Sequence, residues 1–311
     1  MIKLFYDLRF RIGCNKLCSA WNRFMGLMFN KIYPRYSKKM KVSDGLNKEK
    51  RDETVIVSLT SFPARLNVVH YGIKALLNQT YKPDRIILWL TEEECTGIEI
   101  PSELQELCGY GLEIRYAPVN LRPHNKLYYT LKENKDVVVI SVDDDNVYDV
   151  RLIERLMEAH KQHPDCVCCN MAHEITLTDE NLPDLYDSWN GGAIGKTGIS
   201  DCFVALGVGG VLYPPNCFDD EYFRTDLIKD LALSADDLWL KVTELRLGIK
   251  VYKISKHSKI PYVIGGSQKV ALGKENNGMK KNDIIMKKLC EYYKFDWTAL
   301  DAGNDRVEKN V

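Results

Sequence analysis

The stretch Val137–Asp145, VVVISVDDD, decides the fold. Its first six residues are mostly β-branched and apolar, which is typical of a strand buried on both faces. Three carboxylates follow where this strand should leave the sheet. Because like charges repel and buried charges need a counter-charge, the cluster predicts a cation nearby. Carboxylate oxygens suit a hard divalent ion such as Mn²⁺ or Mg²⁺; the alternative is an acidic turn that holds no ligand.

Strands and helices alternate on both sides of this stretch. We expect strands at 55–59, 85–90 and 112–116, and helices at 66–78, 101–108, 125–134 and 150–163. This alternation predicts βαβ units and a mostly parallel sheet. Ligands of such sheets bind beyond the carboxyl ends of the strands, so the acidic cluster should close a nucleotide-binding half. The second half is less regular, with a helix to about residue 247, a strand at 249–254 and a last helix at 288–295.

The length and composition indicate one large domain with an appended segment. The chain has 311 residues, of which 45% are hydrophobic and 28% charged, as in ordinary globular proteins. We divide it into an N-terminal arm and linker (1–52) and a main domain (53–311). Within the main domain we expect a nucleotide-binding half (53–149), an acceptor half (150–265) and a C-terminal tail (266–311).

The arm is basic, whereas the rest of the chain is acidic. Residues 1–51 carry a net charge of +10 and the remaining residues −10. Residues 1–33 predict an amphipathic helix whose apolar stripe comprises Phe10, Cys14, Leu17, Trp21, Phe24 and Met28. A basic helix of this kind can lie on an anionic membrane. We expect residues 1–45 to be the segment that binds such a surface. The alternatives are that the stripe packs on the protein itself or on a second copy.

The cysteines and the hydropathy indicate a cytoplasmic protein. Ten cysteines occur, but Cys166, Cys168 and Cys169 crowd one strand-like segment and should be small buried hydrophobes. No pair of C-x-x-C motifs predicts a zinc site, and a reducing compartment fits best. We find no apolar run of 18 residues and no signal-peptide core. The expected location is the cytoplasm, peripheral on the inner face of the cell membrane.

The loop Thr60–Arg65 follows the first predicted strand, where α/β proteins grip nucleotides. The Arg65 guanidinium could pair with a diphosphate, and Thr60 and Ser61 could hydrogen-bond to it or to a base. Neither a Gly-x-Gly-x-x-Gly motif nor a Walker loop is present, which disfavours dinucleotide binding and simple NTPase chemistry. Lys126 lies at the start of the predicted helix that leads into the strand before the acidic cluster. It either meets phosphate oxygens or is simply exposed.

Asp236 and Asp237 form a second acidic site at the start of a predicted helix. Either Ser234 caps this helix and the carboxylates favour its dipole, or one carboxylate serves as a general base. His257, after the following strand, is either a third metal ligand or plain surface. Gly207, Gly209 and Gly210 indicate either close approach to a ligand or a tight turn.

Four segments together resemble bacterial family 2-like glycosyltransferases of the GT-A fold. They are 58–65 (SLTSFPAR), the strand region 79–90, 142–145 (VDDD) and 236–239 (DDLW). The likeness spans about residues 54–260. It implies an α/β fold with a nucleotide-binding βαβ half, a mixed central sheet and an irregular acceptor half. One departure is that the family often has Glu-Asp where this chain has Asp236-Asp237.

The resemblance implies a nucleotide-sugar donor held by Mn²⁺ or Mg²⁺. Asp237 would be the catalytic base that deprotonates the acceptor hydroxyl. The metal would be bound by Asp143, Asp145 and His257, with Asp145 the direct ligand. The donor would be bound by Thr60, Ser61, Arg65, Lys126, Asp143 and Asp144.

We therefore expect a metal-dependent, inverting glycosyltransferase of surface polysaccharide synthesis, with a glycan or lipid-linked acceptor and no nucleic-acid partner. A rival hypothesis is a sugar nucleotidyltransferase, although such enzymes usually have a Gly-rich loop where this chain has Thr60–Arg65. The other rival is a non-catalytic glycan-binding protein, which would need neither acidic site.

Overall fold

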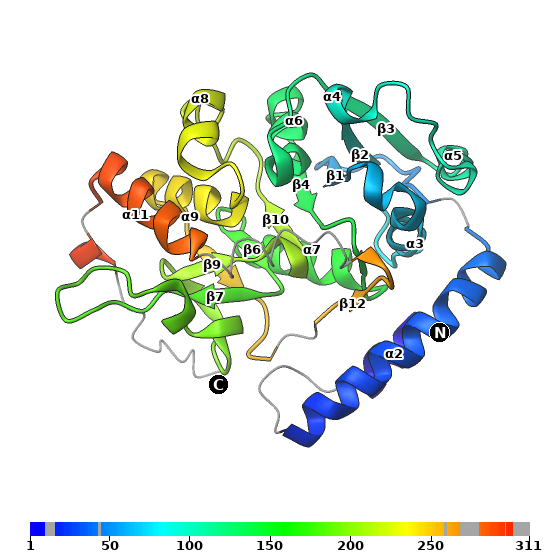
Figure 1. The fold of residues 1–311 in the computed structure, drawn as a ribbon, viewed down its shortest axis with the longest axis horizontal. Coiled ribbons are helices and arrows are strands. Elements are labelled where there is room, and N and C mark those ends of the chain that lie inside the picture. The colour runs from blue at the N-terminus through cyan, green and yellow to red at the C-terminus, as the bar shows by residue number, and fades with distance from the viewer. Residues whose placement is uncertain (10–15, 43–44, 258–259, 268–279, 296, 301–311) are drawn as a thin grey trace.

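A mixed sheet of eight strands forms the centre of the molecule (Figure 1). The structure is a computed structural model and describes residues 1–9, 16–42, 45–257, 260–267, 280–295 and 297–300. The strand order is β3-β2-β1-β4-β10-β6-β11-β8. The first four strands are parallel: β1 (Val55–Thr60), β2 (Arg85–Thr91), β3 (Leu112–Ala117) and β4 (Val138–Ser141). This confirms the predicted α/β class and its βαβ half.

The second half of the sheet mixes strand directions, as expected. Strand β10 (Val211–Tyr213) runs antiparallel to both β4 and β6 (Val167–Cys169). Strand β11 (Val251–Lys253) is parallel to β6, and β8 (Gly198–Ser200) is antiparallel to β11. Two short ribbons flank the sheet: β7 (Ala172–Glu174) with β9 (Phe203–Ala205), and β5 (Asn146–Val147) with β12 (Tyr262–Val263).

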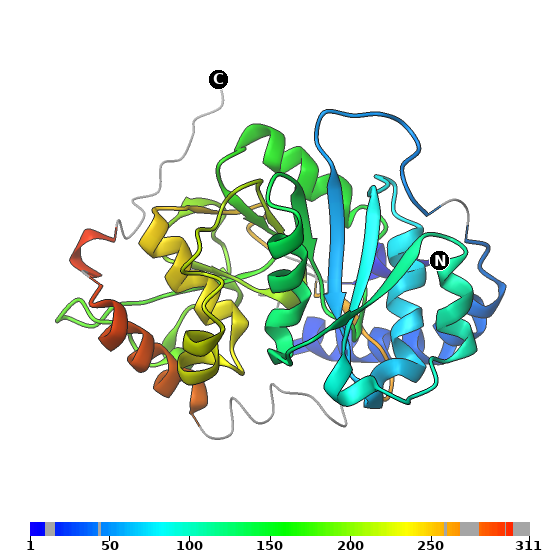
Figure 2. The same cartoon turned by 90° about the horizontal axis from the view of Figure 1, so that it is seen from above.

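Helices cover both faces of the sheet (Figure 2). Because side chains alternate along a strand, Val139 packs in one core and Val138 and Ile140 pack in the other. One face holds α6 (Asn125–Glu133), α9 (Asp236–Leu247) and α11 (Lys281–Tyr293). The other holds α3 (Leu66–Leu77), α5 (Ser102–Cys108) and α7 (Leu152–Gln162). Figure 1 also labels two short helices, α4 (Glu92–Cys95) and α8 (Thr225–Leu227).

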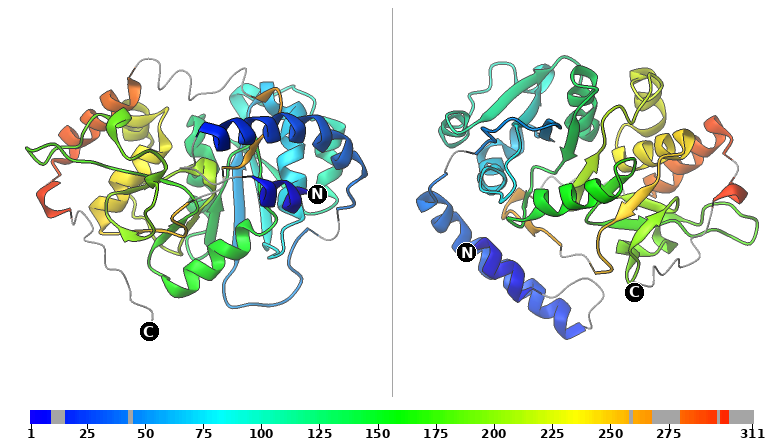
Figure 3. Two further views of the ribbon diagram at one scale, coloured as in Figure 1. Left: turned by 90° about the horizontal axis from the view of Figure 1, so that it is seen from below. Right: turned by 180° about the vertical axis from the view of Figure 1, so that it is seen from behind.

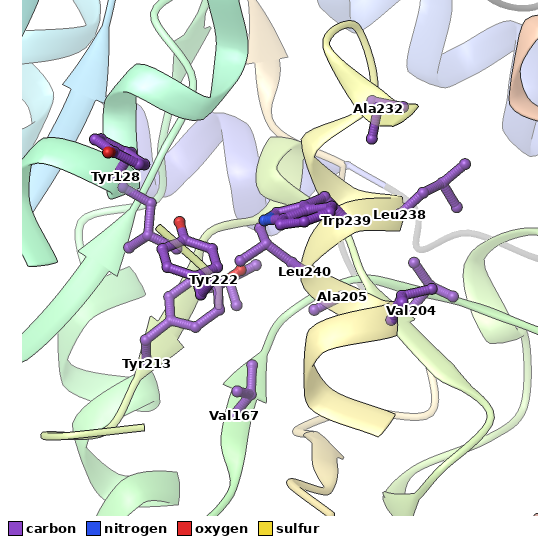
Figure 4. Close-up of a cluster of buried hydrophobic side chains, with 14 of the residues drawn as sticks. Tyr128, Val167, Val204, Ala205, Tyr213, Tyr222, Ala232, Leu238, Trp239 and Leu240 are labelled. Carbon is purple, nitrogen blue, oxygen red and sulfur yellow. The ribbon is translucent and has the colours of Figure 1, made fainter. Parts of the chain in front are cut away.

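An aromatic cluster fixes α9 against the sheet (Figure 4). The Trp239 side chain is fully buried, and it lies with Tyr213 of β10 and Tyr222 in the same core. Burial of large aromatic side chains is among the strongest contributions to packing. Since Trp239 follows Asp237 by two residues, this cluster holds the second acidic site in place.

Several local predictions need correction. Ser234 does not cap α9, because Ala235 occupies the cap position and no side chain bonds there. The last helix begins at Lys281, earlier than predicted, because Ile285 and Met286 belong to its buried side. Strand β12 lies between the predicted strand at 249–254 and the predicted last helix, and it was not among the predicted elements. By contrast, Cys166, Cys168 and Cys169 are buried free thiols, as predicted.

The N-terminal arm consists of two helices rather than one, α1 (Ile2–Leu8) and α2 (Lys16–Lys39). The side of α2 that packs on the protein bears Met25, Phe29 and Tyr33, and the Phe29 ring stacks 4.2 Å from that of Tyr262 in β12. Leu17, Trp21 and Phe24 of the predicted stripe are exposed, so the alternative that these three residues pack on the protein itself is wrong. Phe10 and Cys14 lie outside the described residues. Among the described helices, none is both long and apolar enough to cross a bilayer.

Candidate functional site

The two acidic sites and the front loop meet at the carboxyl ends of β1 and β4. The loop Thr60–Arg65 leaves β1, and the cluster Asp143–Asp145 leaves the adjacent parallel strand β4. Asp236 and Asp237 form the first turn of α9. Lys126, on the first turn of α6, contacts both acidic sites. Parallel strands bring such loops to one edge of a sheet, which is why residues far apart in sequence gather here.

Asp144 binds the front loop to the acidic cluster. Its carboxylate accepts hydrogen bonds from Ser61 Oγ and Arg65 Nη1, both at 2.5 Å. The second arm of the guanidinium, Arg65 Nη2, lies 3.1 Å from Asp145 Oδ2. Burial raises the pKa of Asp144, although the Arg65 charge and the Ser61 hydroxyl oppose this effect. Arg65 therefore neutralises two carboxylates of the cluster.

Lys126 joins the two acidic sites. Its Nζ lies 2.8 Å from Asp143 Oδ1 and 2.9 Å from Asp236 Oδ2. The residue is buried, so the alternative of a simply exposed lysine is wrong. Burial alone would lower its pKa, but the carboxylates of Asp143, Asp236 and Asp237 outweigh burial and raise the Lys126 pKa well above its ordinary value. The ammonium therefore stays charged and holds the two sites together.

Gly207 leaves room for this ion pair. A Cβ atom at this position would lie 2.7 Å from Lys126 Nζ and 3.3 Å from Asp143 Oδ1. The Gly207 backbone N–H also donates a hydrogen bond of 3.2 Å to Asp237 Oδ1. The glycine run forms a tight turn, the second of the two predicted alternatives: Gly207–Gly209 is a 3₁₀ turn and the Gly210 N–H donates to the Gly207 carbonyl. Close approach to a ligand stays a prediction.

The pKa values of the two adjacent carboxylates of α9 are shifted in opposite directions. Burial, and then the negative charge of Asp236, raise the pKa of Asp237 well above its ordinary value. Burial opposes ionisation of Asp236 as well, but the Lys126 charge, the His124 charge and the hydrogen bonds of the carboxylate together outweigh burial and lower the pKa of Asp236. Pairs of carboxylates whose environments separate their pKa values are typical of acid–base sites.

The oxygen donors of Asp143 and Asp145 fit a hard divalent cation by their chemistry. Their side chains are 28% and 13% exposed, so this edge is accessible. Asp145 Oδ1 also accepts a 2.7 Å hydrogen bond from Asn146 Nδ2. Within the described ranges, no group of three or more His, Cys, Asp or Glu side chains is arranged to hold a metal ion.

The remaining predicted residues lie at or outside the edge of this cluster. His257 is exposed after β11, and its backbone exchanges hydrogen bonds with the Ser255 hydroxyl. The structure gives it no contact with Asp143 or Asp145, and its role as a metal ligand stays a prediction. Thr60 Oγ1 donates to the Trp89 carbonyl at 3.0 Å, so its contact with a donor also stays a prediction.

The comparisons with known proteins give a likeness of fold only. No family model matches the chain, and no curated protein matches it in sequence. Among solved structures, the mannosyltransferase PcManGT from Pyrobaculum calidifontis, in complex with GDP-Man and Mn²⁺, is similar with a TM-score of 0.46 and 9% identity over 95% of this chain and 77% of that chain. A CMP:2-keto-3-deoxy-manno-octonic acid synthetase complexed with CTP gives 0.36 and 10% over 65% and 89%. We therefore base the function on the residues of the site.

The sequence analysis gave no supporting role to Tyr148 or Ser58, and it named Gly207 without its contact to Asp237. Tyr148 is fully buried, and its hydroxyl accepts a 2.9 Å hydrogen bond from the Asp143 N–H. Ser58 Oγ donates to the Lys126 carbonyl and thereby holds the first turn of α6. Gly207 orients Asp237 as described above. Only the glycine run gave a signal; a tyrosine and a serine within apolar segments carry none.

Proposed function

We propose that this protein is a metal-dependent glycosyltransferase that moves a sugar from a nucleotide-sugar donor to an acceptor hydroxyl. The single observation that carries the proposal is the Lys126 bridge, with Nζ 2.8 Å from Asp143 and 2.9 Å from Asp236. The bridge brings Asp143 close to the Asp236–Asp237 pair, which supports a phosphate-binding site next to a base. A glycosyl transfer needs both functions: one to stabilise a leaving diphosphate and one to accept the proton of the attacking hydroxyl.

The donor diphosphate would lie against Arg65 and Lys126. Negative charge grows on the leaving diphosphate oxygens as the glycosidic bond breaks, and fixed positive groups stabilise that charge. In this structure both cations neutralise aspartates, so a bound diphosphate would share them with Asp143, Asp144 and Asp145. A divalent cation bound by Asp143 and Asp145 would supply further positive charge to the same oxygens.

Asp237 would accept the proton of the acceptor hydroxyl. Its Oδ1 is held by the Gly207 N–H, which fixes the orientation of the carboxylate. The raised pKa makes Asp237 a stronger base than an ordinary aspartate. Attack on the anomeric carbon from the side opposite the diphosphate inverts its configuration. We infer a glycan or lipid-linked acceptor and a role in surface polysaccharide synthesis at the cytoplasmic face of the membrane, on the basis of the family resemblance and the basic arm.

Donor binding can be tested by thermal unfolding with a panel of nucleotide sugars, with and without Mn²⁺. A ligand at a hundred times its Kd stabilises the folded state by about 2.7 kcal/mol. For a domain of this size, that is a rise in Tm of roughly 5 to 10 °C. We expect one class of nucleotide sugar to raise Tm in the presence of Mn²⁺. If no nucleotide sugar raises Tm under either condition, the proposal is wrong.

Asp145→Ala should remove the dependence of turnover on the metal while the protein stays folded. We expect turnover with saturating Mn²⁺ to fall by about a hundredfold or more, because positive charge at the diphosphate contributes several kcal/mol to catalysis. The measurement is the rate of donor consumption against Mn²⁺ concentration, with circular dichroism to confirm folding. Asp149→Ala is the control, since Asp149 follows β5 and pairs with Arg155 at 2.5 Å, outside the cluster. Equal rates for the two variants would contradict the metal role of Asp145.

A further inference from the structure

The outer face of the N-terminal arm is both apolar and basic. Four apolar side chains of α2 face solvent: Leu17 is 80% exposed, Trp21 40%, Phe24 51% and Leu27 68%. At helical spacing these four share one broad side of α2, which is turned away from the buried Phe29 and Tyr33. Such a face costs free energy in water unless something covers it.

Helix α1 extends this apolar face. Leu4 and Leu8 are 58% and 49% exposed, although Ile2, Phe5 and Tyr6 of the same helix are buried. The Trp21 Nε1–H donates a 2.8 Å hydrogen bond to the Leu8 carbonyl, which brings the end of α1 to the exposed side chains of α2. Figure 3 shows α1 and α2 beside each other on the outside of the molecule. The exposed apolar residues thus come from both helices.

The charge of the arm is almost entirely positive. Residues 1–9 and 16–41 contain nine Lys and Arg residues and one acidic residue, Asp7. A cavity of about 330 Å³ opens where the start of α1 meets the end of α2, and Lys3, Lys39 and Lys41 are among its lining residues. Three ammonium groups around a small cavity complement a phosphate-bearing headgroup. The apolar row, nearer the start of α2, offers a surface for acyl chains on the same arm.

We propose that the exposed face of α1 and α2 binds an anionic phospholipid bilayer. The apolar row would enter the boundary between headgroups and acyl chains, and the lysines would contact anionic headgroups. The charge complementarity favours this occupant over a second copy of the chain, whose identical basic arm would repel it. This binding needs no glycosyl transfer, so it stands or falls separately from the proposed function.

The arm is also connected to the acidic site through hydrogen bonds. Tyr6 Oη donates to the Val147 carbonyl at 2.8 Å, in β5. Ile264 follows the partner strand β12, and its N–H donates to the Asp145 carbonyl at 2.8 Å. Asn30 of α2 bonds to the Val263 carbonyl at 3.0 Å. The arm that would bind the bilayer is therefore hydrogen-bonded to the backbone next to the acidic cluster. This connection suits an acceptor that is held in the membrane.

Vesicle sedimentation of the full chain tests this proposal. We expect the protein to pellet with vesicles of phosphatidylcholine and phosphatidylglycerol at low salt, and to stay in solution with phosphatidylcholine alone. High salt should weaken the binding, because screening reduces the attraction between exposed charges. Failure of the full chain to pellet with the anionic vesicles would overturn the proposal.

Two sets of substitutions distinguish this face from the rest of the surface. The apolar set is Leu17→Gln, Phe24→Gln and Leu27→Gln, and its control is Ile98→Gln, Leu182→Gln and Leu185→Gln, which are exposed apolar residues elsewhere. The charge set is Lys3→Glu, Lys39→Glu and Lys41→Glu, and its control is Lys161→Glu, Lys229→Glu and Lys256→Glu, also exposed. Each arm set should weaken vesicle binding by about tenfold or more, because the charge set removes attraction to anionic headgroups and the apolar set removes side chains that enter the bilayer.

Two results with these variants would overturn the proposal. One is vesicle binding by the arm variants equal to that of their controls. The other is a full chain that does not bind vesicles but forms a dimer in size-exclusion chromatography, with the apolar set disrupting that dimer. That result would assign the face to a second copy. Circular dichroism of every variant confirms that α2 is still helical.

Discussion

Asp237→Asn should lower turnover by about 10²- to 10⁴-fold, the range that general base catalysis contributes. Asparagine keeps the size of the side chain and can still accept the Gly207 N–H hydrogen bond, but it cannot take a proton from the acceptor hydroxyl. Donor binding should change little, because Arg65 and Lys126 remain in place. The measurement is the turnover rate together with the donor-induced rise in Tm. A near-normal rate would remove Asp237 from the mechanism.

The same substitution should stabilise the protein at neutral pH. The pKa of Asp237 is raised in the folded state by burial and by the charge of Asp236. Its favourable contribution is therefore present below the unfolded pKa and is lost as pH rises through the folded pKa. The asparagine side chain does not titrate, so the gain should appear as pH increases above about 4, the pKa of an unperturbed aspartate. Urea unfolding at several pH values measures it, with Asp179→Asn, at an exposed position, as the control.

The pH dependence of turnover should follow the same group. Because only the ionised form of Asp237 accepts a proton, the wild-type rate should rise with pH through a pKa above the ordinary aspartate value. The residual rate of Asp237→Asn should lack this rise. A rise of equal shape in both proteins would assign the titration to another group.

Lys126→Met should lower the free energy of unfolding by about 3–5 kcal/mol at neutral pH, the typical cost of removing one partner of a buried ion pair. Methionine fills similar space but leaves Asp143 and Asp236 without the ammonium that lies 2.8 and 2.9 Å away. Urea unfolding measures the loss. The control is Lys135→Met, because Lys135 is 61% exposed and its partner Asp220 98%; an exposed pair contributes about 0–1 kcal/mol. Equal small losses for both variants would contradict the bridging role of Lys126.

Acid should reduce the damage done by Lys126→Met. Lys126 lowers the pKa of Asp236 in the folded state, so the stability from this pair is present above the unfolded pKa of Asp236 and is lost as pH falls through the folded pKa. As the carboxylates take up protons, the missing ammonium matters less. The difference between wild type and Lys126→Met in urea should therefore shrink on acidification; a constant difference would point to lost packing instead.

The sequence predicted the βαβ half and the place of the acidic cluster because local patterns determine both. The β-branched run of β4 is typical of a buried strand, and the parallel order of β1 and β4 brings Arg65 to Asp144. The pattern also predicted that Asp237 starts a helix. These features depend on hydrophobic periodicity and on the rule that loops gather at the carboxyl ends of parallel strands.

Contacts between distant segments could not be predicted. Helix α2 has two apolar sides. The side that packs on the protein is the one whose Phe29 stacks on Tyr262, a residue more than 200 positions away in the sequence. The partner of Lys126 could not be deduced either, because phosphate and carboxylate are equally good acceptors for an ammonium. Tyr148 supports Asp143 through a single hydroxyl within a buried segment, a contact that no periodicity reveals.

The central claim is that the acidic cluster, the bridging lysine and Asp237 transfer a sugar and release a nucleoside diphosphate. Analysis of the products tests it most directly: the purified protein is incubated with Mn²⁺, an acceptor and the nucleotide sugar that raises its Tm, with a chelator in a parallel sample. We predict release of a nucleoside diphosphate that the chelator abolishes. Release of pyrophosphate would instead indicate nucleotidyl transfer, and binding without any product would indicate a glycan-binding protein; either result would contradict the claim.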